Sequence, residues 1–244
     1  HTKDFYLYEI FCHRESYVLK MQPDGPMVIG NDVQVLGPQK NSVNSFMYDK
    51  ANGGVDYIVC AHRGFWRDPG VPENNIPAFN ASLSLGAPNV RDGVQNINMI
   101  ELDVKITKDQ VLVLFHDDQL WRLSSLMDNV NLQPSELQNL EGTLITKINW
   151  NNPATKMAIQ KSDGSGNIYV TLPPLKNARP KDRFGNVVDI SMMSLEEALL
   201  FLKEKNIMIA LDKITGQITR VFEAALRTDT EDLILLKGNA GSYH

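Results

Sequence analysis

The stretch MIELDVKITKDQVLVLFHDD, residues 99–118, has the pattern of a strand, a tight turn and a second strand. Because successive side chains of a strand point to opposite faces, Glu101 and Asp103 lie on the same face of the first strand. Two adjacent carboxylates repel each other and are costly to bury without a partner. A hard divalent cation held between them removes both costs. The structural alternative is that they are surface salt-bridge partners, with Lys105 two residues further on the same face.

Two histidines stand where apolar strands end. Residues 111–115 are apolar and deliver His116, and residues 57–61 are apolar and deliver His62, which is followed by Arg63. Histidine is the side chain best suited to pass protons near neutral pH. Alone, either histidine could be no more than a hydrogen-bonded core residue. Two of them beside a carboxylate pair favour a catalytic site, at which Arg63 would contact a phosphoryl oxygen.

From residue 55 onward, strands alternate with helices. We expect strands at residues 57–61, 99–104, 111–115, 207–211 and 233–236, and helices at 76–85, after Ser194 and around 218–225. Such alternation indicates parallel βα units, and the polar strand ends fit the active-site rim of a TIM (β/α)8-type barrel. These are about five barrel strands, so the barrel is expected to be incomplete by ~90 residues, at ~30 residues for each missing unit.

Two segments stand apart from this alternation. Residues 1–56 hold short strand-like runs, FYLYEIFC, SYVLKMQ, MVIG and VQVL, separated by turn signals. We predict a small β-rich N-terminal extension there and a barrel domain at 57–244. Residues 143–186 are rich in Asn, Gly, Pro and Lys and are expected to form a long loop or an inserted hairpin with 161–166 at its tip.

Composition narrows the class of protein. A net charge of −5 without a basic run gives no support for nucleic-acid binding. No apolar run approaches the ~20 residues that span a bilayer, so no transmembrane segment is expected. The chain begins HTKD, so we expect a processed or trimmed start, and composition leaves the compartment open. Its two cysteines make no disulfide framework, and Cys60 is expected to be a buried thiol.

Residues 58–122 resemble the glycerophosphodiester phosphodiesterase family in the order and spacing of their motifs. Each motif is weak alone, and together they are specific. The similarity resumes at MSLEEA, residues 193–198, and at Asp212-Lys213. The motifs are HRG at 62–64, PEN at 72–74, AF at 78–79, IELDV at 100–104, TKD at 107–109, HD at 116–117, and Arg122.

The resemblance implies a TIM-barrel hydrolase that cleaves a small-molecule glycerophosphodiester to sn-glycerol 3-phosphate and an alcohol. It implies that His62 and His116 are the general acid and base, in an order that the sequence leaves open. It also implies that Arg63 contacts the phosphate and that Glu101 and Asp103 bind a divalent metal ion, Ca²⁺ or Mg²⁺.

The third metal carboxylate of the family comes from the fourth strand, as Glu with Lys two residues later. Here the strand ends in an adjacent pair, Asp212-Lys213, so we assign Asp212 to the metal and Lys213 to the substrate across this difference in spacing. Glu73 and Asn74 have two interpretations: they support the ligands from behind, or they only start the helix at residue 76.

Three functions remain open at this point. The first is a metal-dependent glycerophosphodiesterase. The second is a non-catalytic barrel that binds a phosphodiester. The third is a related phospholipase D-like or phosphoinositide phosphodiesterase on the same fold. An intact set of site residues favours the first.

Overall fold

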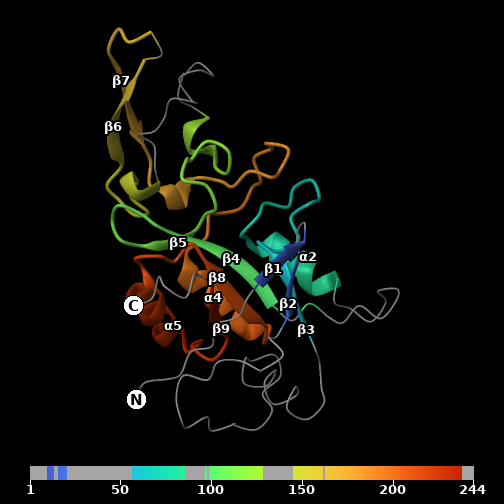
Figure 1. Cartoon of the computed structure of the whole chain (residues 1–244). Helices are drawn as coiled ribbons and strands as arrows, with labels where there is room; N and C mark the ends of the chain where they lie inside the picture. The colour runs from blue at the N-terminus through green and yellow to red at the C-terminus, as the bar shows by residue number, and fades with distance from the viewer. Residues whose placement is uncertain are drawn as a thin grey trace.

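A computed structural model describes residues 10–13, 16–20, 57–85, 97, 99–128, 145–161 and 163–237 (Figure 1). Its main sheet has the strand order β1-β2-β3-β4-β8-β9, and β5 pairs with β4 off this path. The strands and helices are β1 (Ile10–His13), β2 (Ser16–Lys20), β3 (Tyr57–His62), α2 (Ile76–Leu85), β4 (Met99–Ile106), β5 (Leu112–Leu114), β6 (Thr155–Gln160), β7 (Asn167–Leu172), α4 (Leu195–Glu204), β8 (Met208–Asp212), α5 (Ile218–Thr228) and β9 (Ile234–Leu236). Short 3₁₀ turns lie at Ser125–Met127, Ile145–Lys147 and Leu175–Asn177.

Four consecutive strands of the main sheet, β3, β4, β8 and β9, run parallel. Helices α2, α4 and α5 lie beside them (Figure 1). The protein therefore has the expected α/β fold with a parallel sheet. The strands within the described ranges do not close into a barrel.

The strand after the tight turn differs from the expected parallel arrangement. β5 pairs antiparallel with the end of β4, with Val104 opposite Leu114. The reason is the shortness of the connection: Thr107 N donates to Val111 O at 3.0 Å, so the chain reverses at once and has no room for a crossover helix. In this hairpin, β4 continues past its pairing with its parallel neighbours, and β5 then runs back toward them.

Side-chain alternation along β4 separates the core from the site. Ile100, Leu102 and Val104 belong to the main hydrophobic cluster, which also contains residues of α2, α4, α5, β8 and β9. Glu101 and Asp103 consequently point to the opposite face. The buried face of β4 thus fixes where the carboxylates lie.

Two of the expected helices, α2 and α4, begin with a side-chain cap. Asn75 Oδ1 accepts from Ile76 N at 2.8 Å at the start of α2. Ser194 and Glu197 form a capping box at the start of α4, in which each side chain accepts from the other's backbone N–H. Cys60 is a free, buried thiol, as expected.

The insertion forms the antiparallel hairpin β6–β7, in which Lys161 N donates to Gly166 O near the tip, and it projects away from the main sheet (Figure 1). Its base closes a second cluster that includes Leu172, Trp150 and, from the β4–β5 hairpin, Val113 and Phe115. No helix among the described residues is long and apolar enough to cross a membrane.

Strands β1 and β2 fall within the predicted β-rich extension, and β2 pairs antiparallel with β3. The other strand-like runs of residues 1–56 lie outside the described residues. The division into two domains at residue 56 stays a prediction.

Candidate active site

The carboxylates predicted to bind a metal converge at one place in the sheet. Because β4 and β8 are parallel neighbours, Asp103 stands directly opposite Asp212, and Glu101 lies two residues before Asp103. One ligand oxygen from each of the three lies within 4.8 Å of the others. The adjacent Asp-Lys pair of β8 therefore still delivers a carboxylate to this cluster.

Glu101 and Asp103 are 0% and 1% exposed, so they are not surface salt-bridge partners. Lys105 pairs with Asp118 instead. Glu101 Oε2 accepts from Arg63 N at 3.1 Å, but Glu101 Oε1 is buried without a hydrogen-bond partner among the described residues. Burial and the adjacent Asp103 carboxylate raise the pKa of Glu101 well above its ordinary value. An unsatisfied oxygen in an all-carboxylate cluster fits a hard divalent ion.

Arg63 and Asn74 hold Asp103 in place. Asp103 Oδ2 lies 3.0 Å from Arg63 Nε and accepts from Asn74 Nδ2 at 3.1 Å, while Asp103 N donates to Asn74 Oδ1 at 3.1 Å. Arg63, Asn74 and Lys213 all have left-handed backbones, with φ of 58°, 54° and 60°. Such conformations are costly for residues with a Cβ and gather at functional sites.

His62 ends β3 opposite Glu101, and its Nε2 lies 3.8 Å from Glu101 Oε2. Burial, followed by the charge of Arg63, lowers the pKa of His62 to about 4. This imidazole is therefore neutral near pH 7, and its Nε2 accepts from Arg63 Nε at 3.1 Å.

His116 reaches the same place because the hairpin returns it. Phe115 N donates to Asp103 O at 3.0 Å, so His116 follows at the level of the carboxylates even though β5 is antiparallel. His116 Nδ1 lies 2.7 Å from Asp117 Oδ1. That contact makes Nδ1 the protonated nitrogen and leaves Nε2 for proton exchange.

Asp117 and Arg122 received no role in the site predicted from the sequence. Together they connect His116 to Glu73. Arg122 donates to both oxygens of Asp117, and it also donates to Glu73, which pairs with Arg63. Burial alone would raise the pKa of Asp117, but hydrogen bonds from Arg122 and His116 hold it well below its ordinary value. Glu73 is buried and joins two guanidinium groups, so it does more than start a helix.

Two lysines, Lys213 and Lys237, place positive charge beside the carboxylates of the cluster. Lys213 Nζ donates to His116 O at 2.7 Å and lies 3.8 Å from Asp103 Oδ1. Lys237, at the end of β9, was not predicted, although a polar residue closing an apolar strand is the signal that identified Asp212. Its Nζ is 2.6 Å from Asp212 Oδ2 and 4.0 Å from Glu101 Oε1.

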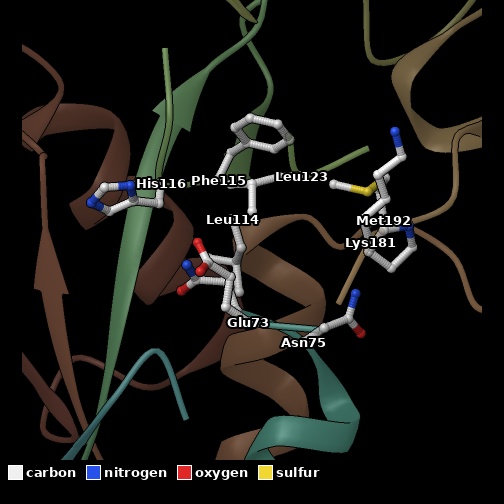
Figure 2. Close-up of a pocket in the computed structure, with 10 residues that line it drawn as sticks. Glu73, Asn75, Leu114, Phe115, His116, Leu123, Lys181 and Met192 are labelled. Carbon is white, nitrogen blue, oxygen red and sulfur yellow. The ribbon is translucent and has the colours of Figure 1, made fainter. Parts of the chain in front are cut away.

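A hollow lies against this site (Figure 2). Glu73 and His116 lie toward one side of it, and Lys181 and Met192 toward the other. Leu114 and Phe115 supply apolar lining. The hollow therefore extends from His116 to the inserted segment, residues 143–186.

The sequence model of the glycerophosphoryl diester phosphodiesterase family matches residues 62–228. The chain belongs to this family. The match begins at His62, the last residue of β3, covers the strands that carry Glu101, Asp103 and Asp212, and ends before Lys237.

Similar proteins carry the same family name. A glycerophosphodiester phosphodiesterase of Caldanaerobacter subterraneus subsp. tengcongensis is 44% identical over 68 residues, which cover 28% of this chain and 23% of that protein. The Bacillus altitudinis enzyme of that name is 41% identical over 68 residues, with the same coverage. A glycerophosphoryl diester phosphodiesterase structure from Parabacteroides distasonis has 25% identity and a TM-score of 0.46, covering 72% of this chain and 45% of the other. The matched region spans less than half of each of these proteins.

Proposed function

We propose that the chain hydrolyses glycerophosphodiesters to sn-glycerol 3-phosphate and an alcohol, with a divalent ion and two histidines. The observation that carries this proposal is the convergence of three carboxylates, one with an unsatisfied buried oxygen, beside His62. Membership of the family and the names of the similar proteins support the substrate class.

The residues that would hold Ca²⁺ or Mg²⁺ are Glu101, Asp103 and Asp212. A bound ion would supply positive charge to the non-bridging oxygens of the phosphodiester. Arg63 and Lys213 lie beside the carboxylates and add positive charge of their own. Arg63 is the stronger candidate for phosphate contact, because its planar fork can bind two oxygens.

The two histidines have different surroundings, and these suggest different roles. His62 is neutral near pH 7, the form that would take the proton of the attacking oxygen, from water or from the glycerol hydroxyl of the substrate, once Nε2 releases the hydrogen bond from Arg63 Nε. His116, oriented by Asp117, would then protonate the leaving alcohol. The phosphorus–oxygen bond to that alcohol breaks as the new one forms. If the glycerol hydroxyl attacks, the product of this step is a cyclic phosphodiester, which water then opens to sn-glycerol 3-phosphate.

The test is hydrolysis of glycerophosphocholine by the ion-stripped chain with Mg²⁺ or Ca²⁺ restored. His62→Ala and His116→Ala should each lower kcat by about 10²–10⁴-fold, the usual contribution of a proton-transferring side chain. Arg227→Ala, which alters an exposed ion pair with Glu196, is the matched control. Turnover near wild type in both histidine variants contradicts the proposal.

Product analysis separates this function from the other two. Hydrolysis of glycerophosphocholine by the proposed reaction releases choline and sn-glycerol 3-phosphate. Cleavage confined to phosphatidylcholine or phosphatidylinositol would instead indicate a lipid phosphodiesterase. Saturable binding without release of any product would indicate a non-catalytic barrel.

A further inference from the structure

Lys237 lies beside the carboxylate cluster, and the predicted site gives this lysine no role. Strand β9 is the parallel neighbour of β8, with Leu236 opposite Leu211, so Lys237 follows β9 at the level of Asp212. The backbone anchors it there, because Lys237 N donates to Leu211 O at 2.8 Å. Its side chain is one-quarter exposed.

The ammonium group of Lys237 lies where two of the proposed ligands meet. Its Nζ donates to Asp212 Oδ2 at 2.6 Å and lies 4.0 Å from Glu101 Oε1, the oxygen without a hydrogen-bond partner. The other oxygen of Asp212 accepts from Lys213 N at 2.6 Å. Both oxygens of Asp212 therefore already accept a hydrogen bond.

An ion that binds Asp212 through Oδ2 meets this ammonium group directly. Two cations cannot share one carboxylate oxygen at such short range without strong repulsion in a partly buried site. Lys213 is differently placed, since its Nζ is hydrogen-bonded to the carbonyl of His116. Among the described residues, Lys237 is therefore the lysine whose side chain donates a hydrogen bond to a proposed metal carboxylate.

We propose that Lys237 is a built-in counter-ion of the metal site: it stabilises the ion-free carboxylates, and a divalent ion binds by displacing its ammonium group from Asp212. The inference rests on the proposed function, because it takes the carboxylate cluster as the metal site. Lys237 consequently lowers the affinity for the ion while it keeps the ion-free site folded.

The experiment titrates Mg²⁺ and Mn²⁺ into the ion-stripped full chain by calorimetry, without substrate. Lys237→Met should bind at least about tenfold more tightly than wild type, since the ammonium group that competes with the ion for Asp212 is removed. The ion-free variant should also melt at a lower temperature than wild type. Lys237→Arg retains the charge and should bind nearly as wild type does. Lys203→Met, which removes an exposed partner of Asp229, controls for loss of a surface charge.

A second readout uses the wild-type chain and needs no variant to fold. Displacement from Asp212 should make Lys237 react faster with an amine-acetylating reagent when Mg²⁺ is saturating, as followed by mass spectrometry. Equal or weaker ion binding by Lys237→Met, or unchanged acetylation of Lys237, overturns the inference. If wild type binds the ion and hydrolyses substrate, such a result leaves the proposed function intact. If no variant binds an ion, the metal site and this inference fail together.

Discussion

At the scale of single residues, His62 makes the clearest pH-dependent prediction. Burial and Arg63 lower its pKa from 6.5 to about 4 in the ion-free protein, whereas the unfolded chain restores the ordinary value. The unfolded state therefore binds more protons between these two values, and His62 contributes stability that is complete above pH 6.5 and is lost as the pH falls toward 4. Imidazole NMR should show His62 neutral at pH 5.5. Titration of His62 near pH 6.5 contradicts this environment.

The neighbouring carboxylates Asp117 and Asp118 provide a matched pair. Asp117 contacts His116 and Arg122, whereas Asp118 is exposed and pairs with Lys105. Asp117→Asn should lower kcat for glycerophosphocholine by about 10²-fold with little change in KM, because His116 loses the partner that fixes its protonated nitrogen. Asp118→Asn should leave both constants near wild type. Equal effects of the two substitutions would show that Asp117 does not position His116.

Most side chains of the site could be predicted from the sequence, because each stands at the end of an apolar strand or in a recognisable motif. The contacts among them could not. Asn74 and Asn75 are both plausible helix caps by sequence, yet Asn75 caps α2 and Asn74 binds Asp103. That choice depends on the position of β4, which is distant in the sequence.

At the scale of elements, Gly64 fixes how α2 sits against β3. Its φ is +74°, and a Cβ added there would lie 2.8 Å from the backbone of Ala78 in α2. Gly64→Ala should therefore lower the free energy of unfolding by about 2–5 kcal/mol, from backbone strain and overpacking together. Chemical denaturation measures this change.

Gly70 is the control for Gly64. It has a similar φ of +77°, but nothing lies within 4 Å of an added Cβ. Gly70→Ala should lose only about 1–2 kcal/mol, the cost of the left-handed backbone. If the two substitutions destabilise equally, close approach to α2 is not what requires glycine at residue 64.

Element types were predictable from periodicity, whereas strand direction was not. The alternating and apolar runs located the barrel strands within a residue or two, and α5 ends three residues beyond the expected helix. They carry no information on pairing direction, so β5 was expected to run parallel and is antiparallel. Lys237 was missed for a related reason: only the register of β9 on β8 brings it beside Asp212.

At the scale of the whole molecule, two hydrophobic clusters share the β4–β5 hairpin. Leu112 and Leu114 belong to the main cluster, and Val113 and Phe115 to the cluster under the insertion. Because successive residues of β5 face opposite clusters, we expect the two clusters to unfold in one transition. The hairpin that carries His116 is thereby held from both sides.

Leu172 and Tyr169, both on β7, test this arrangement. Leu172 is 1% exposed in the second cluster, and Tyr169 is 81% exposed. Leu172→Ala should cost about 2–5 kcal/mol and shift a single unfolding transition. Tyr169→Ala should change stability by no more than ~0.5 kcal/mol. A separate early transition in Leu172→Ala would show that the insertion unfolds independently.

The central claim is that the carboxylates at the ends of β4 and β8 form a metal centre beside two histidines. Anomalous diffraction from crystals soaked in Mn²⁺ tests this claim most directly. We expect a single strong peak within about 2.6 Å of oxygens of Glu101, Asp103 and Asp212, as hard-cation coordination requires. No peak at these oxygens, at an ion concentration that saturates activity, would contradict it.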